Sequence, residues 1–348
     1  YSGNIKKLLL FTVYLLLITS VTTRILNPYS FVGLFRPNSR FIDNIKELEN
    51  YNQPDSWFPP AIQWNNTKPL IFPAKNIFFW GLGVPMGILI LIAIARVILS
   101  AAKDPKGILR PKFRPQNDDL MIVIWILLLF IYQGVQFSKT MRYFLPIYPF
   151  MALVGGNFLS KYFPKIPRVP KFLVLGSLFI YPLMFMAIYS RPHTRVKASQ
   201  WIYENIPPGS TISCEHWDDC LPLSIGKKNP SLYNQETLPL YDKDTDEKWK
   251  KINNQLEKID FIIISSSRLY GSIPMLPERY SKSIDFYKRL FSDELITISN
   301  KGRFKKVAEI TSYPSLFGIE LNDDASEEAF TVYDHPKVII FEKTINEK

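Results

Sequence analysis

The sequence predicts a polytopic α-helical membrane region of about five spans, followed by a small extracytoplasmic α/β domain. Two observations predict this fold class. The first half of the 348 residues contains apolar runs, several of them close to the roughly 20 residues that cross a bilayer. The second half is charged and alternates helical with extended patterns. We therefore place the membrane region at residues 1–190 and the α/β domain at residues 191–348.

The predicted spans are five apolar segments. The first, "LLLFTVYLLLITSV", is as short as the apolar part of a signal peptide. No small-residue cleavage site is obvious after it, and further apolar segments follow. We therefore interpret it as a membrane span. The five segments are Leu8–Val21, Ile77–Leu99, Leu120–Gln136, Tyr143–Leu159 and Phe172–Tyr189.

Basic residues predict the orientation of these spans. Two loops, 100–119 and 160–171, are rich in lysine and arginine, as cytoplasmic loops are. Alternation then places the loop 25–76, the turn before Tyr143 and the whole domain 191–348 outside. This pattern accounts for much of the net charge of +11, so the charge does not point to nucleic acid as a partner. The basic residues of the two loops are Lys103, Lys106, Arg110, Lys112, Arg114, Lys161, Lys165, Arg168 and Lys171.

The second half predicts a small layered α/β domain. Its apolar residues recur at helical spacing in three stretches and form compact or alternating strand patterns in four others. In chain order the stretches are the helix "RVKASQWIYENI", the strand "STISCE", the helix "DEKWKKINNQLEKI", the strand "DFIIISSS", the helix "PERYSKSIDFYKRLF" and the strands "FKKVAEI" and "KVIIFEK".

The stretch "KTMRYFLPIYP", residues 139–149, is the first candidate site. Lys139 and Arg142 stand at the outer mouth of a segment that Pro146 and Pro149 make irregular. An arginine there suits a lipid-linked phosphate. The alternative is that both cations snorkel at a helix end beside interfacial tyrosines, which the residues alone favour slightly.

The external loop is the second candidate site. It gathers Trp57, Trp64 and further aromatic residues beside Asp55 and Lys68. Aromatic faces with a few polar groups suit a sugar or a prenyl chain. An interfacial segment that its aromatic residues anchor in the headgroups explains the composition equally well.

Two polar clusters in the second half receive plainer interpretations. In "CEHWDDC", Cys214 and Cys220 predict a disulfide or two buried thiols, and the spacing matches no common zinc pattern. The acidic stretch from Asp323 to His335 predicts a solvated turn before the last strand. The sequence contains no Walker loop, dinucleotide glycine fingerprint, G-x-S-x-G or HExxH, so nucleotide hydrolysis, redox and common hydrolase chemistry lack support.

Three motifs carry a family resemblance. "WGLGVPMGI", "KTMRYFLPIYPFMAL" and "ASQWIYENIPPGSTI" together resemble the polytopic GT-C membrane glycosyltransferases, and within them the protein O-mannosyltransferase-like group, which uses phospholipid carriers. The resemblance implies transfer of a sugar, with mannose as one candidate, from a polyprenyl-phosphate donor. The acceptor would be a glycan, lipid or protein at the outer face, and the phosphate would leave as the anomeric carbon inverts. Whether a divalent metal assists stays open.

The resemblance also implies roles for residues. Arg142, supported by Lys139, would stabilise the departing phosphate. Tyr143, Trp64 and Lys68 complete the predicted substrate-binding set. The family's catalytic carboxylate lies in its first external loop, which Asp55 does not match. We therefore expect a C-terminal part of a larger enzyme, inactive alone.

Two alternatives from other classes stay open. One is a membrane-anchored external domain that binds or scaffolds cell-envelope polymer. Five spans are more than such an anchor needs. The other is part of a transporter, suggested by polar groups at a broken helix.

Overall fold

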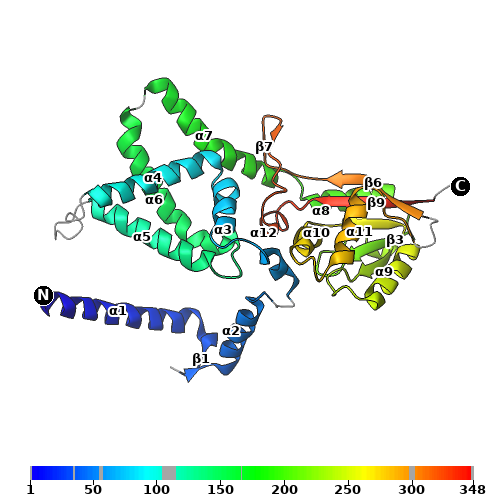
Figure 1. Ribbon diagram of the computed structural model, residues 1–348, viewed down its shortest axis with the longest axis horizontal. Helices are drawn as coiled ribbons and strands as arrows, with labels where there is room; N and C mark the ends of the chain where they lie inside the picture. The colour runs from blue at the N-terminus through cyan, green and yellow to red at the C-terminus, as the bar shows by residue number, and fades with distance from the viewer. Residues whose placement is uncertain are drawn as a thin grey trace. The chain divides into compact units, whose positions relative to one another are not determined.

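The chain divides into two compact units, Tyr1–Phe58 and Pro59–Lys348. A computed structural model describes residues 2–33, 36–54, 58–103, 115–165, 167–297 and 302–345. Each unit is described by itself below, with the element labels of Figure 1.

The first unit consists of a long apolar helix and a shorter amphipathic one. Helix α1, Ser2–Leu26, contains a stretch long and apolar enough to cross a membrane. A short hairpin separates it from helix α2, Ser39–Tyr51, whose first turn is capped because the side chain of Asn38 accepts the N–H of Arg40 at 3.1 Å. The connecting elements are η1 (Pro28–Ser30), β1 (Phe31–Val32) and β2 (Arg36–Pro37).

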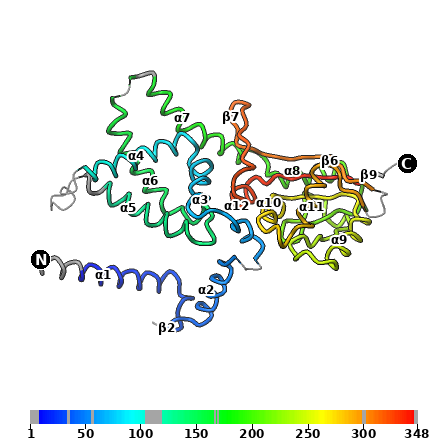
Figure 2. Tube along the Cα trace, in the orientation of Figure 1, coloured from blue at the N-terminus to red at the C-terminus, as the bar shows by residue number. Residues whose placement is uncertain are grey.

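The second unit begins with a group of helices whose common core is apolar (Figures 1 and 2). Ile90 and Ala93 of α4 pack there with Ile126 of α5 and Val154 of α6. The elements are η2 (Pro59–Trp64), α3 (Ile71–Asn76), the π-helix η3 (Ile77–Gly81), α4 (Val84–Lys103), α5 (Pro115–Gly134), η4 (Met141–Ile147), α6 (Tyr148–Tyr162), η5 (Phe163–Lys165), α7 (Arg168–Met186) and η6 (Ala187–Ser190).

Among the described residues, three helices are long and apolar enough to cross a membrane. They lie in α1, in α4 and in the stretch Pro170–Asn205, which starts in α7 and is interrupted at residues 191–193. All five predicted apolar segments contain helix, but the apolar part of α5 and the whole of α6 are shorter than these three. The segment predicted from Tyr143 is divided because Pro146 falls within the 3-10 helix η4, so α6 starts only at Tyr148.

The α/β domain contains a five-stranded mixed sheet of order β4-β3-β5-β9-β6. Strand β3 pairs in parallel with β4 and β5, and β9 pairs antiparallel with β5 and β6. The principal strands and helices are α8 (Thr194–Asn205), β3 (Thr211–Glu215), β4 (Asn234–Leu238), α9 (Asp246–Lys258), β5 (Phe261–Ile264), α11 (Ser281–Phe291), β6 (Gly302–Ile310) and β9 (Val338–Ile345). The shorter elements are η7 (Pro230–Leu232), α10 (Arg268–Ser272), η8 (Ile273–Met275), β7 (Ser315–Leu316), β8 (Ile319–Glu320) and α12 (Glu328–Thr331).

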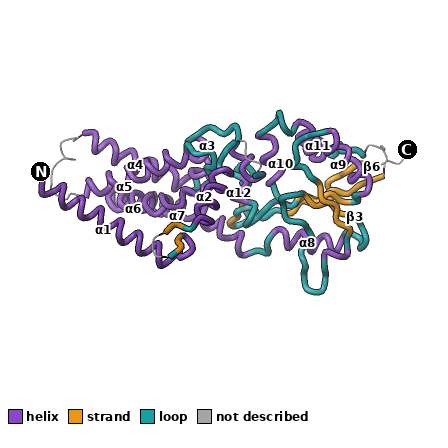
Figure 3. The backbone as a smooth tube through the Cα atoms, turned by 90° about the horizontal axis from the view of Figure 1, so that it is seen from below, coloured by secondary structure: helices purple, strands orange, loops and turns teal. Residues whose placement is uncertain are grey.

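The two faces of the sheet are covered by different helices (Figure 3). In β5, Phe261 and Ile263 pack with Ile202 of α8, whereas Ile262 and Ile264 pack in the core that α9 and α11 share. This alternation is the two-residue period of a strand buried on both faces. The predicted α/β domain is therefore present, and β4 and the short helices α10 and α12 are additions to the predicted set.

Candidate functional site

A cavity of about 500 Å³ lies between the apolar helices of the second unit and the chain that follows β8. We call it the Arg142 cavity. Helices α6 and α7 and the segments η3 and η4 contribute to one part of its wall, and the residues 327–334 contribute to the other. The lining residues used below are Trp80, Arg142, Tyr181, Phe185, Glu327 and Phe330.

Aromatic side chains form part of this wall. The ring of Phe330 lies 5.4 Å from that of Phe185 and 6.5 Å from that of Trp80, between ring centroids. The hydroxyl of Tyr181 in α7 donates to the backbone carbonyl oxygen of Trp80 at 2.6 Å, which ties the end of η3 to α7. Phe330 itself packs against the apolar core that α4, α5 and α6 share. Such a wall suits an isoprenoid chain or the apolar face of a sugar.

Arg142 supplies the positive charge of the cavity. It lies in η4 and is exposed, with its guanidinium 6.0 Å from the centre of the Tyr143 ring. Within the described part of the chain, no carboxylate lies within ion-pair distance of it. The guanidinium is therefore available to an anion, and its planar fork matches two oxygens of a phosphate.

Glu327 fixes the segment that carries Arg142. Its Oε1 accepts a hydrogen bond from Oγ1 of Thr140 at 2.6 Å and another from the backbone N–H of Met141 at 2.8 Å. Thr140 is the N-cap of η4, so this carboxylate caps the helix in place of a local side chain. The N–H of Glu327 donates to Oδ1 of Asn76 at 3.0 Å. Glu327 is consequently a positioning residue for Arg142.

The other oxygen of Glu327 is buried without a partner. The residue is 6% exposed, and Oε2 lacks a hydrogen bond in the structure. Burial raises the pKa of Glu327 to about 7, and nearby Glu328 adds to the rise, although the bonds from Thr140 and Met141 and the charge of Arg142 oppose it. Near neutral pH this group exchanges a proton readily, as acids and bases of active sites do.

Infrared difference spectroscopy is expected to detect this ionisation. A carboxylic acid C=O band present at about pH 6 and lost by about pH 8 should belong to Glu327, and Glu327→Gln should remove it. Burial also raises the pKa of Glu215, so the band is assigned to Glu327 by its loss in Glu327→Gln and not by its position alone. A difference band that persists in the variant would contradict the assignment.

The structure brings only Arg142 of the five predicted substrate-binding residues to the cavity wall. Lys139 precedes the cap and is buried, which lowers its pKa. Tyr143 is exposed beneath Arg142. Trp64 is buried against Phe137, with ring centroids 6.3 Å apart, and Lys68 is exposed. Asp55 and Trp57 of the external loop lie outside the described residues.

The interpretation of the acidic stretch as a solvated turn is wrong. Asp323, Glu327 and His335 are 1%, 6% and 3% exposed. Nε2 of His335 lies 2.7 Å from Oδ2 of Asp323, and Glu328 forms an ion pair with Arg268 at 2.9 Å. The side chains of Asp323, Glu327 and His335 are buried, whereas Asp324 and Tyr333 in the same stretch are exposed. The stretch contacts the apolar helices through Phe330 and the end of β5 through the pair of Glu328 with Arg268. Its composition alone offers no signal for this, since acidic turns on a surface contain the same residues.

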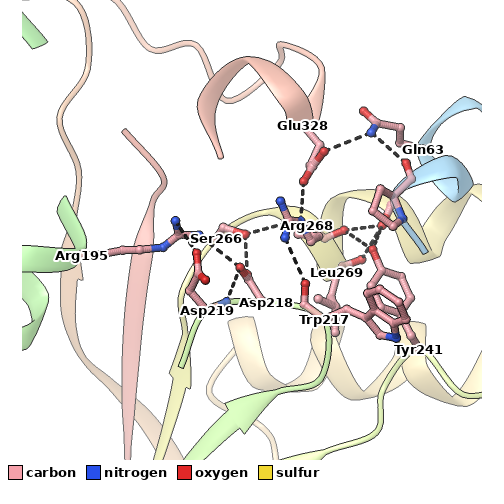
Figure 4. A network of polar contacts seen from close by, with 12 residues as sticks. Gln63, Arg195, Trp217, Asp218, Asp219, Tyr241, Ser266, Arg268, Leu269 and Glu328 are labelled. Carbon is pink, nitrogen blue, oxygen red and sulfur yellow. Dashed lines mark hydrogen bonds and ion pairs between the residues drawn. The ribbon is translucent and has the colours of Figure 1, made fainter. Parts of the chain in front are cut away.

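A polar network holds this stretch against the end of the sheet (Figure 4). Arg268, which follows β5, donates to Glu328 and to the carbonyl oxygen of Trp217. Gln63 of η2 also donates to Glu328, at 3.0 Å. The network thus joins the α/β domain, α12 and the start of the second unit.

The loop after β3 belongs to the same network. Arg195 pairs with Asp218 at 3.1 Å and with Asp219 at 2.7 Å, and Ser266 donates to Asp218. A disulfide between Cys214 and Cys220 closes this loop, which decides between the two predicted alternatives. The described ranges contain no group of three or more His, Cys, Asp or Glu side chains that could hold a metal ion.

Comparison with known proteins finds no matching family model, no matching curated protein and no matching solved structure. The resemblance to GT-C glycosyltransferases therefore stands on the sequence motifs alone.

Proposed function

We propose that this protein belongs to a membrane glycosyltransferase that takes a sugar from a polyprenyl-phosphate donor and transfers it at the outer face. In this proposal the five helical segments α1, α4, α5, α6 and α7 cross the membrane, and the α/β domain lies outside. Arg142 binds the phosphate of the donor, and the aromatic wall of the cavity receives the first isoprene units or the sugar.

One observation supports this function more than any other. Arg142, a cation without a carboxylate partner among the described residues, shares a cavity of about 500 Å³ with an aromatic wall and with Glu327. A lipid-linked sugar phosphate needs these three elements: a cation for the leaving group, an apolar surface for the lipid and a carboxyl group near the reacting centre. Snorkelling alone does not explain why a distant carboxylate fixes the helix that carries Arg142.

A binding measurement tests the donor site. The full-length protein in lipid nanodiscs is titrated with farnesyl phosphate as the probe. Arg142→Ala should weaken binding about 10- to 100-fold, the loss expected for hydrogen bonds to a charged group, about 1.5–3 kcal/mol. Lys75→Ala removes a similar charge from an exposed position on α3 and should leave the affinity unchanged. Equal affinity of the wild type and Arg142→Ala would refute the role assigned to Arg142.

A further inference from the structure

The hairpin formed by β7 and β8 carries two exposed apolar side chains. Its strands pair through Ser315 with Glu320 and through Leu316 with Ile319, and Phe317 and Gly318 form the turn. Phe317 is 95% exposed, more than any other large apolar residue in the described part of the chain, and Ile319 is 70% exposed. Both side chains therefore project from the tip of the hairpin with little protein around them.

The turn holds Phe317 in a backbone conformation that a bulky residue disfavours. Its φ is +50°, and that of Gly318 is +81°. Two successive positive φ values are typical of a type I′ turn, in which asparagine or aspartate commonly precedes the glycine. A bulky side chain rarely adopts a positive φ, because the conformation is strained. Such strain indicates that the phenyl ring has a role other than forming the turn.

The hairpin lies beside α7, which begins a stretch long and apolar enough to cross a membrane. Strand β7 packs against α7 and η6, as Figure 1 shows. Arg191, which follows η6, ties the hairpin to this place. Its guanidinium donates to the carbonyl oxygen of Tyr313 at 3.3 Å and to the hydroxyl of Ser315. The hairpin is thus held at the C-terminal end of α7.

The apolar surface of α7 leads toward this hairpin. Phe179, Leu183 and Met186 recur at helical spacing and are exposed, and Tyr189 of η6 is exposed as well. In a helix that crosses a membrane, such side chains face lipid, and tyrosines are enriched where the lipid meets water. The hairpin therefore stands where the lipid-facing surface of α7 reaches the interface.

We infer that the β7–β8 hairpin inserts its tip into the bilayer beside α7, with Phe317 and Ile319 as the anchoring side chains. Apolar side chains at the interface gain free energy by entering the boundary between headgroups and acyl chains. Lipid, and not a second copy of the chain, covers the tip because the adjoining surface of α7 faces lipid. The inference rests on that part of the proposed function in which α7 crosses the membrane, and it does not depend on the sugar donor.

An anchored hairpin bears on the Arg142 cavity. The N–H of Leu321 donates to the carbonyl oxygen of Pro314 at 2.9 Å, which closes the base of the hairpin. The chain then continues to residues 327–334, which form part of the cavity wall. A tip fixed in lipid therefore limits the movement of the segment that carries Glu327.

Spin labels test the insertion in the full-length protein. The sequence contains two cysteines, and both form the disulfide, so one introduced cysteine is the only free thiol. Phe317→Cys and Ile319→Cys are labelled separately in nanodiscs of palmitoyl-oleoyl phosphatidylcholine. Electron paramagnetic resonance then compares collisions with oxygen, which concentrates in lipid, and with a nickel chelate, which stays in water. Both labels should lie about 5–10 Å into the boundary between headgroups and acyl chains.

Two further labels separate the possible results. Phe179→Cys, on the exposed surface of α7, should lie deeper in lipid, and Lys227→Cys, on an exposed turn between β3 and β4, should lie in water. Hairpin labels in water with the Phe179 label in lipid would overturn the anchor and leave the span intact. If the Phe179 label also lay in water, the span and the proposed function would fail with it. Hairpin labels shielded from both reagents and broadened by a neighbouring label would overturn the inference in favour of a second copy of the chain.

Phe317→Asn separates the anchor from the fold. Asparagine tolerates a positive φ and is common in this turn, so the variant should fold and its Tm should not fall. In nanodiscs, the label at Ile319→Cys should shift toward water when Phe317→Asn is added. An unchanged depth of that label would overturn the anchoring role of Phe317.

Discussion

Under the proposed function, Arg142→Ala is expected to lower sugar transfer by the full-length protein about 100- to 1,000-fold, the range observed when one group that stabilises a developing negative charge is removed. The phosphate gains charge as its bond to the anomeric carbon breaks. Arg142 is fixed for this role because Glu327 caps its helix, so little reorganisation is needed during the reaction. The loss should appear mainly in kcat and less in KM.

Two control variants make this result specific. Arg142→Lys retains the charge but loses the two-oxygen fork, so it should recover only part of the activity. Lys75→Ala should retain full activity, because the Lys75 side chain is exposed on α3 and does not line the Arg142 cavity. If Arg142→Ala and Lys75→Ala showed the same turnover, Arg142 would be an interfacial anchor and not a ligand of the phosphate.

Asp218→Ala is expected to destabilise the α/β domain by about 3 kcal/mol, as the loss of one partner from a buried ion pair does. The Asp218 side chain is fully buried, and Arg195 is 8% exposed. Asp219 binds the same arginine, at 2.7 Å, but its side chain is 62% exposed. Asp219→Ala should therefore cost less than about 1 kcal/mol, because water screens an exposed pair.

Thermal unfolding of the domain within the full chain distinguishes the two variants. A domain of this size loses about 2–4 °C of Tm for each kcal/mol, so Asp218→Ala should lower Tm by about 6–12 °C and Asp219→Ala by less than about 4 °C. Equal shifts would mean that burial does not determine the strength of these pairs.

Local sequence patterns predicted most of the fold. The long apolar helices and strand β5, Phe261–Ile264, can be predicted from neighbouring residues alone, because their length and apolar pattern are local properties of the sequence. Strand β4, Asn234–Leu238, was not predicted, since "NQETL" has little apolar character and forms a strand through its pairing with β3. Helix α6 is shorter than predicted because Pro146 lies in the 3-10 helix η4. The apolar run alone does not show that a 3-10 helix precedes α6.

The candidate site was predicted only in part, and for a different physical reason. Arg142 stands in a recognisable motif, whereas Glu327 contacts Thr140 across 187 residues and Gln63 contacts Glu328 across 265. Such contacts arise only when segments far apart in the chain pack together. Periodicity and spacing within one segment contain no information about them.

The capping of η4 by Glu327 has a consequence for biosynthesis. The helices that precede the α/β domain are made first, and at that stage the N–H of Met141 at the start of η4 lacks the carboxylate of Glu327 as a partner. The cap, and with it the fixed position of Arg142, forms only after residue 327 has emerged and the domain has folded. A chain that has not yet reached residue 327 therefore lacks both the cap of η4 and one part of the wall of the Arg142 cavity.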